Sequence, residues 1–95
     1  MRLKFEWDER KNAVNIMKHG VSFEDAKLIF YDPKCIEIYD CGHSLHEDRW
    51  RLIGLSGYNI LTVIFTEKDG FYRIISASKA EKKEEEVYFY GYSKM

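Results

Sequence analysis

The pattern of apolar and polar positions divides the chain into strand-like and helix-like segments. Near the start, Leu3, Phe5 and Trp7 alternate with charged residues, and this period of two predicts a short half-buried strand. Asp8 follows as the expected N-cap of a helix. That helix ends at Gly20, a residue that readily takes the left-handed conformation found at helix ends.

The first predicted helix carries its apolar positions Ala13, Ile16 and Met17 on one face. Lys18 and His19 lie in its last turn, where cations interact favourably with the negative end of the helix dipole. That structural role accounts for both residues without a ligand.

A second short helix is predicted from Ser22 to the Asp32-Pro33 pair. Ser22 and Asp25 have capping-box spacing, although Asp25 stands where Glu or Gln is commoner. Proline disfavours helical backbone in the residue before it, so Asp32-Pro33 ends the helix. The buried face of this helix is marked by Phe23, Ala26 and Phe30.

Beyond Pro33 the period returns to two and predicts four antiparallel strands. Residues 35–39 and 49–55 alternate, residues 60–66 are apolar on both faces as in a central strand, and residues 71–76 return from a turn. Turn-forming residues at 56–59 and 67–70 predict two hairpins. The result is a meander of neighbouring strands.

The end of the chain predicts a last helix. Ser78 and Glu81 have the spacing of a capping box, and the charged run after them favours helix. Only Ala80, Val87 and Tyr88 mark an apolar face, so this helix is expected to pack weakly.

The order of elements predicts one α+β domain over residues 1–95, with a small antiparallel sheet packed by helices (β-α-α-β-β-β-β-α). A chain of 95 residues is large enough for one core. It has no apolar run of membrane-spanning length and no apolar leader before the first strand, so the cytoplasm is the expected compartment. Cys35 and Cys41 are then expected to be reduced thiols.

Charge is distributed unevenly although the net charge is only -1. Residues 21–48 carry seven acidic and two basic residues, whereas residues 49–83 carry seven basic and three acidic ones. The basic block could hold a polyanion. A solvated strand edge with a charged helix face explains the same composition.

Arginines in the basic block carry the clearest candidate chemistry. Alternation places Arg49 and Arg51 on one face of a strand, and Arg73 can share that face across the meander. Three crowded guanidiniums repel each other, which favours a phosphate held among them by the planar fork of arginine.

His43, His46 and Glu47 precede Arg49 and supply groups for proton transfer. Cleaving RNA without a metal needs a base, an acid and cations that stabilise the charged transition state. Structural roles remain open, namely loop solvation for the histidines and a cross-strand ion pair for Glu47. The sequence predicts no metal site and no cofactor, and it lacks the motifs of P-loop nucleotide binders, zinc proteases and serine hydrolases.

Aromatic residues gather late in the chain, where they either stack on bases or form core and a partner-binding patch. They are Phe71, Tyr72, Tyr88, Phe89, Tyr90 and Tyr92.

Several motifs together resemble the BrnT toxin family of bacterial type II toxin-antitoxin systems. The motifs are Phe5-Glu6-Trp7-Asp8, Asn15-x-x-Lys18-His19-Gly20-Val21-Ser22-Phe23-Glu24-x-Ala26, Asp32-Pro33, His43-Ser44-x-x-Glu47-x-Arg49, Ile53-Gly54, Thr66-Glu67 and Arg73-Ile74-Ile75-Ser76-Ala77. They span nearly the whole chain.

The resemblance implies a RelE-like fold and an endoribonuclease that arrests translation without a metal cofactor. It also implies a BrnA-type ribbon-helix-helix antitoxin that neutralises the toxin, with operator DNA bound only through that antitoxin and no membrane partner. Within the family motifs, His43, Glu47 and Arg49 match the loop-strand segment, and Arg73 and Ser76 match the late strand.

We therefore expect Arg49 and Arg73 to hold the phosphate with help from Lys79, while Glu47 or His43 exchanges protons. Arg51 and Ser76 are expected to bind substrate. One departure stands out, because relatives usually carry Arg after Ile-Ser-Ala and this chain has Ser78, followed by Lys79. The departure leaves open a catalytically weak or silent homologue that binds the antitoxin as a co-repressor. A scaffold domain without a ligand is disfavoured by the clustered arginines.

Overall fold

The computed structural model describes residues 2–91, apart from the side chain of His43. Its strands are β1 (Phe5–Glu6), β2 (Ile36–Tyr39), β3 (Trp50–Ser56), β4 (Asn59–Lys68) and β5 (Phe71–Lys79). Its helices are α1 (Glu9–His19), α2 (Phe23–Ala26) and α3 (Lys82–Tyr90), with 3-10 turns η1 (Lys27–Tyr31) and η2 (Cys41–His43). None of the described helices is long and apolar enough to span a membrane.

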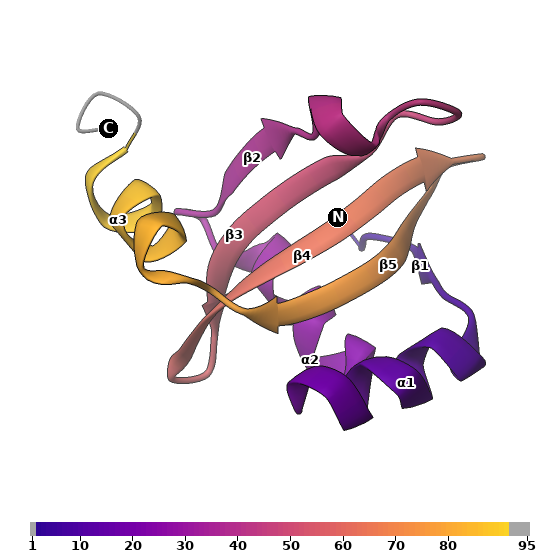
Figure 1. Cartoon of the computed structure of the whole chain (residues 1–95), viewed down its shortest axis with the longest axis horizontal. Coiled ribbons are helices and arrows are strands. Elements are labelled where there is room, and N and C mark those ends of the chain that lie inside the picture. Colours follow the sequence, from indigo (N-terminus) through magenta and orange to yellow (C-terminus); the bar gives the residue numbers. More distant parts are fainter. Residues whose placement is uncertain (1, 92–95) are drawn as a thin grey trace.

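The five strands form one sheet in the order β1-β5-β4-β3-β2 (Figure 1). This arrangement confirms the predicted α+β class and the central position of residues 60–66. The four later strands are antiparallel, as predicted, but β1 joins β5 in parallel, with Phe5 beside Tyr72 and Glu6 beside Arg73. The predicted antiparallel sheet missed this parallel pairing, because β1 and β5 are far apart in the sequence and no turn joins them.

One face of the sheet carries the core. Val63 and Phe65 of β4 pack there against Phe23 of α2 and Ile29 of η1, all fully buried. Figure 1 shows α1 and α2 on this side of the sheet, whereas α3 lies alone at one end. We call the opposite face the open face. Among the described elements, only α3 covers part of it, over β3, where Val87 and Ile53 are buried.

Strand β3 runs very close to η1 at Gly54. A Cβ atom at this position would lie 2.9 Å from Ile29 Cβ and 3.1 Å from Cys35 Cβ. Gly54 therefore lets the connection that follows α2 press directly onto the sheet.

Helix α1 is held to the sheet by an amide rather than by its apolar stripe. Asp8 caps it and Gly20 ends it in the left-handed conformation, as predicted. However, Ala13, Ile16 and Met17 are exposed, and Asn15 is the buried residue. The Asn15 amide donates to Val21 O at 2.9 Å and Ala77 O at 2.7 Å, and it accepts from Ala77 N at 3.1 Å.

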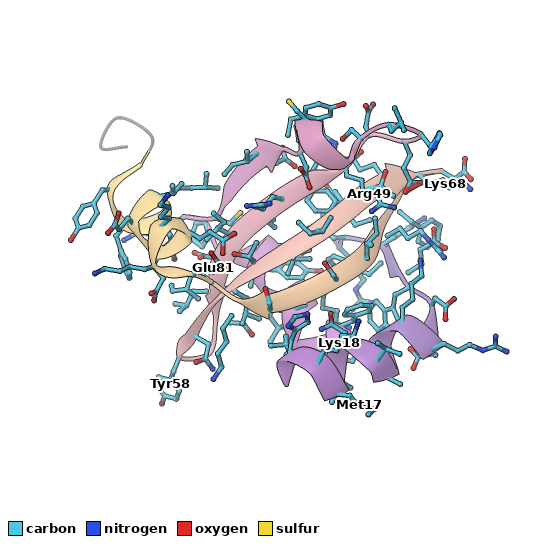
Figure 2. The ribbon with its side chains drawn as sticks, viewed as in Figure 1. Met17, Lys18, Arg49, Tyr58, Lys68 and Glu81 are labelled. Carbon is cyan, nitrogen blue, oxygen red and sulfur yellow. The ribbon has the colours of Figure 1, made fainter. Side chains whose placement is uncertain are left out.

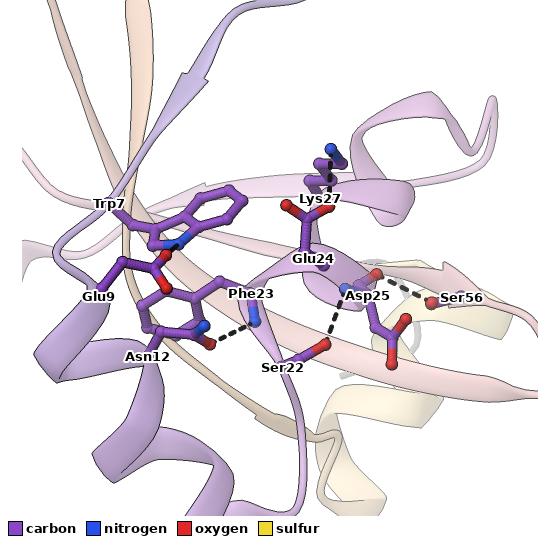
Figure 3. A network of polar contacts seen from close by, with 9 residues as sticks. All are labelled: Trp7, Glu9, Asn12, Ser22, Phe23, Glu24, Asp25, Lys27 and Ser56. Atoms are coloured by element: carbon purple, nitrogen blue, oxygen red, sulfur yellow. Dashed lines mark hydrogen bonds and ion pairs between the residues drawn. The ribbon is translucent and has the colours of Figure 1, made fainter.

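The segment after α1 is fixed by polar contacts that Figure 3 shows from close by. Asn12 Oδ1 accepts from Phe23 N at 2.9 Å, and Ser22 Oγ accepts from Asp25 N at 3.1 Å, as its predicted capping role requires. The predicted single helix from Ser22 to Asp32 instead divides into α2 and η1, because the backbone tightens to 3-10 geometry at Lys27.

The predicted start of the last helix is wrong by one turn. Ser78 does not cap it, because its backbone continues β5 and pairs with Thr62 of β4. The capping box is formed by Glu81 and Glu84, which exchange side-chain and backbone hydrogen bonds. The helix packs sparingly, as expected, with Val87 as its buried residue.

Candidate active site

The candidate site lies on the open face at the end of β4. Arg73 of β5 pairs with Thr66 of β4. Arg49 precedes Trp50, which pairs with Phe65, so Arg49 comes beside Thr66 from the other side. Trp50, Phe65 and Ile74 face the core, so the alternation of strand residues turns both arginines to the open face. Two strand spacings separate their backbones by about 10 Å.

Each candidate arginine has a carboxylate partner. Arg49 Nε lies 3.5 Å from Glu47 Oε2, Arg73 Nη1 lies 3.6 Å from Glu6 Oε2, and Arg51 Nη1 lies 3.1 Å from Glu84 Oε2. The structure therefore replaces the predicted mutual repulsion with three ion pairs. Arg49 and Arg73 remain about one-third exposed, so both are accessible to a ligand.

Ser44 organises the loop that carries Glu47. Its hydroxyl donates to Asp40 O at 2.6 Å and accepts from Arg49 N at 2.9 Å. Thr66 Oγ1 fastens the same loop to β4 by donating to Asp48 O at 2.6 Å. These bonds fix the backbone on both sides of the acidic loop and thereby position Arg49.

The predicted substrate-binding pair, Arg51 and Ser76, faces the next part of the same surface. Both residues pair with Ile64, from β3 and β5 respectively. They line a cavity of about 480 Å³ between the open face and the start of α3. The structure thus brings Arg49, Arg51, Arg73, Glu47 and Ser76 together on one face.

Lys79 is not part of this group. It pairs with Leu61 near the other end of β5 and lines a groove with Val21 and Leu28 on the helix-covered side. A β-bulge explains the change of face, because Ile64 pairs with Ser76 and Phe65 with Ile74, which leaves Ile75 as an extra residue.

The positions of the two loop histidines do not assign either of them a role in the site. The side chain of His43 lies outside the described residues, and His46 is exposed. Lys18 and His19 occupy the last turn of α1, consistent with their helix-end role. Figure 2 shows Lys18 and Arg49 well apart, by α1 and at the far end of the sheet respectively.

Glu6 is the site residue that the sequence did not single out. It approaches Arg73 only because β1 pairs with β5 in parallel. The alternation of residues 2–7 in the sequence places Glu6 on the polar face of the first strand. Alternation alone does not show which strand lies next to the first one.

Two buried polar atoms on the open face lack hydrogen-bond partners. In the described part of the chain they are Arg49 Nε and Thr62 Oγ1, and both residues belong to the open face by strand alternation. Arg49 Nε has only the loose ion pair with Glu47 described above. Buried polar atoms normally have a hydrogen-bond partner. Because these two have none in the protein, both can still bond to a ligand or a water molecule. Among residues 2–91, no cluster of three His, Cys, Asp or Glu side chains is arranged to hold a metal.

A larger cavity of about 750 Å³ lies away from the arginines, between α3 and the β3-β4 turn. Tyr88 and Asp32 both line it, and the Tyr88 hydroxyl donates to Asp32 Oδ2 at 2.6 Å. This hydrogen bond, together with burial, raises the pKa of Tyr88 to about 12. Burial raises the pKa of Asp32, but hydrogen bonds from Tyr88 and two backbone amides outweigh it and lower that pKa. The pair fastens α3 to the loop before β2.

Comparison with known protein families identifies the family to which the chain belongs. The family model described as ribonuclease toxin, BrnT, of type II toxin-antitoxin system matches residues 7–84. A search of curated proteins finds no match. The matched range includes the arginines and the acidic loop of the open face, whereas Glu6 lies just before it.

Proposed function

Since the chain belongs to the BrnT family of ribonuclease toxins of type II toxin-antitoxin systems, we propose that the open face is its catalytic surface. The observation that carries this proposal is the pair of arginines beside Thr66, each about one-third exposed and next to a carboxylate. A phosphate between Arg49 and Arg73 replaces the loose carboxylate contacts with charge-assisted hydrogen bonds. The unpartnered Nε of Arg49 supports the same assignment.

The proposed reaction is attack by the 2'-hydroxyl on the neighbouring phosphate, without a metal. The 2'-oxygen bonds to phosphorus as its proton passes to a base, and the bond from phosphorus to the 5'-oxygen breaks as that oxygen gains a proton. Glu47 or His43 exchanges these protons, and Arg49 and Arg73 stabilise the charge that develops on the phosphate. The products are a 2',3'-cyclic phosphate and a 5'-hydroxyl.

Arg49 gives the direct test. Arg49→Ala should lower the rate of RNA cleavage about 100- to 1000-fold, because it removes a preorganised donor to a developing charge. Arg49→Lys should recover part of the rate, since the ammonium keeps the charge but lacks the fork. Thermal unfolding of Arg49→Ala should stay within about 4 to 8 °C of the wild type, equivalent to roughly 1 kcal/mol.

Arg10 of α1 is a matched control, because it is an exposed arginine on another part of the surface. Arg10→Ala should leave the cleavage rate unchanged within a factor of about two. A folded Arg49→Ala protein that cleaves RNA at the wild-type rate would place the active site elsewhere.

Metal independence is tested separately. Cleavage should persist in excess EDTA and leave cyclic phosphate ends, because the proposed groups supply the base, the acid and the cations themselves. Activity that disappears on chelation and returns with magnesium or manganese contradicts the mechanism.

The proposed partner is a BrnA-type antitoxin, and the proposed compartment is the cytoplasm. Several exposed side chains around the α3 cavity support a protein-binding surface next to the open face. Leu55, Tyr58 and Phe89 line the cavity of about 750 Å³, and Tyr90 is exposed nearby on α3. Co-expression with the product of a neighbouring ribbon-helix-helix gene should yield a co-purifying complex without RNA cleavage, and a soluble antitoxin that does not co-purify argues against this pairing.

A second candidate function is a silent homologue that acts only as antitoxin-binding partner and co-repressor. The existing ion pair of every candidate arginine favours it, as does the serine at position 78. An intact complex whose freed toxin shows no RNA cleavage would select this alternative.

A further inference from the structure

The cavity between the open face and α3 contains three hydroxyl groups that make no hydrogen bond in the described part of the chain. They belong to Thr62, Ser76 and Ser78. The Thr62 side chain is the most telling, because the residue is 5% exposed and its Oγ1 is buried without a partner. A buried hydroxyl left in this state lowers stability, so its retention points to a ligand that satisfies it.

The remaining wall of the cavity is charged. Arg51 approaches from β3, and Glu81 and Glu84 approach from the start of α3. Glu84 Oε2 accepts from Arg51 Nη1 at 3.1 Å, while its Oε1 accepts from Glu81 N at 2.8 Å. Figure 2 shows Glu81 at this junction of sheet and helix. A carboxylate oxygen can accept more than one hydrogen bond, so the wall still offers acceptors to a ligand.

The cavity adjoins the proposed phosphate site. Arg73 pairs with Thr66, and the next open-face pair along β4 is Ile64 with Ser76, followed by Thr62 with Ser78. One such step along a strand is about 7 Å. A nucleotide whose phosphate lies between Arg49 and Arg73 therefore has the cavity within reach of its base.

We propose that this cavity binds the base of a nucleotide next to the cleaved phosphate and gives the enzyme a sequence preference. The proposal rests on the ribonuclease function proposed above. Unstacked bases of single-stranded RNA are read by hydrogen bonds to their edges, and hydroxyl groups serve as both donors and acceptors there. The carboxylates of Glu81 and Glu84 accept from exocyclic amino groups, so adenine, guanine or cytosine fits this wall better than uracil, which has no such group.

Thr62→Val is the informative variant, because valine keeps the shape and removes the unsatisfied hydroxyl. Its free energy of unfolding should equal or exceed that of the wild type. Cleavage of a random single-stranded RNA pool, with cut ends sequenced, should show a wild-type bias against uracil at one position beside the cut. Thr62→Val and Ser78→Ala should each weaken that bias roughly 3- to 10-fold at this same position.

Ser56→Ala is the matched control, since the Ser56 hydroxyl donates to Asp25 O at 2.9 Å on another part of the molecule. It should leave the bias unchanged. Wild-type cleavage without any bias, or a bias that neither variant moves, overturns the base site and leaves the ribonuclease function standing. Absence of cleavage by the wild type rejects both.

Discussion

Replacing Asn15 by alanine should cost this domain much of its stability, although the change removes no apolar contact. The Asn15 side chain is buried beneath α1. Its amide donates to the backbone of Val21, which follows α1, and to the backbone of Ala77 in β5. Asn15→Ala removes the amide and leaves three buried backbone atoms without partners, namely Val21 O, Ala77 O and Ala77 N.

The magnitude follows from those three atoms. Each buried polar group that loses its partner costs about 1–3 kcal/mol, so the lower bound for the set is about 3 kcal/mol. At roughly 0.05–0.15 kcal/mol per residue, a domain of this length has about 5–14 kcal/mol of stability in total. The expected fall in unfolding temperature is at least about 12 °C.

Urea denaturation followed by tryptophan fluorescence measures this loss, since Trp7 and Trp50 both pack against the core. Asn12→Ala is the matched comparison on the same helix, because Asn12 makes one partly buried bond, to Phe23 N. It should cost about 1 kcal/mol. If Asn15→Ala unfolds at the same urea concentration as Asn12→Ala, the amide does not hold α1 as described here.

Two further predictions concern other contacts. Gly54→Ala should destabilise the fold by about 1–3 kcal/mol in urea denaturation, because the new methyl group meets Ile29, whereas Gly42→Ala, with its nearest atom at 3.9 Å, should change little. The Tyr88 hydroxyl has a pKa raised from 10.0 to about 12, so its contribution to stability is complete below pH 10 and is lost as pH rises through 12. The stability difference between wild type and Tyr88→Phe should therefore shrink across this range, and a constant difference contradicts the assigned hydrogen bond.

Local signals in the sequence predicted most of the elements. The turn at Asp69 and Gly70 was readable because both residues adopt positive φ, at 53° and 82°, which few other residues tolerate. The stripe of Ala13, Ile16 and Met17 misled, because apolar spacing gives no sign that a buried amide can hold a helix against the backbone.

The candidate site was predicted as far as strand alternation reaches. Alternation placed Arg49 and Arg51 on one face, and a hairpin brought Arg73 beside them. Lys79 was chosen for its place after the family motif, and alternation over residues 71–76 could not show that a single extra residue in β5 puts it on the other face. Alternation could not find the contact of Glu6 with Arg73, since parallel neighbours are not joined by a turn.

The parallel pairing of β1 with β5 sets the order in which the molecule is completed during synthesis. A ribosome releases the N-terminus first, but Phe5 and Glu6 find their partners only at Tyr72 and Arg73. Closing so long a loop precedes the contacts that compensate for its lost entropy, so this pairing belongs to the late steps of folding. The first strand and the carboxylate it carries therefore remain unpaired until β5 has been synthesised, and the arrangement around Arg73 is assembled only after that.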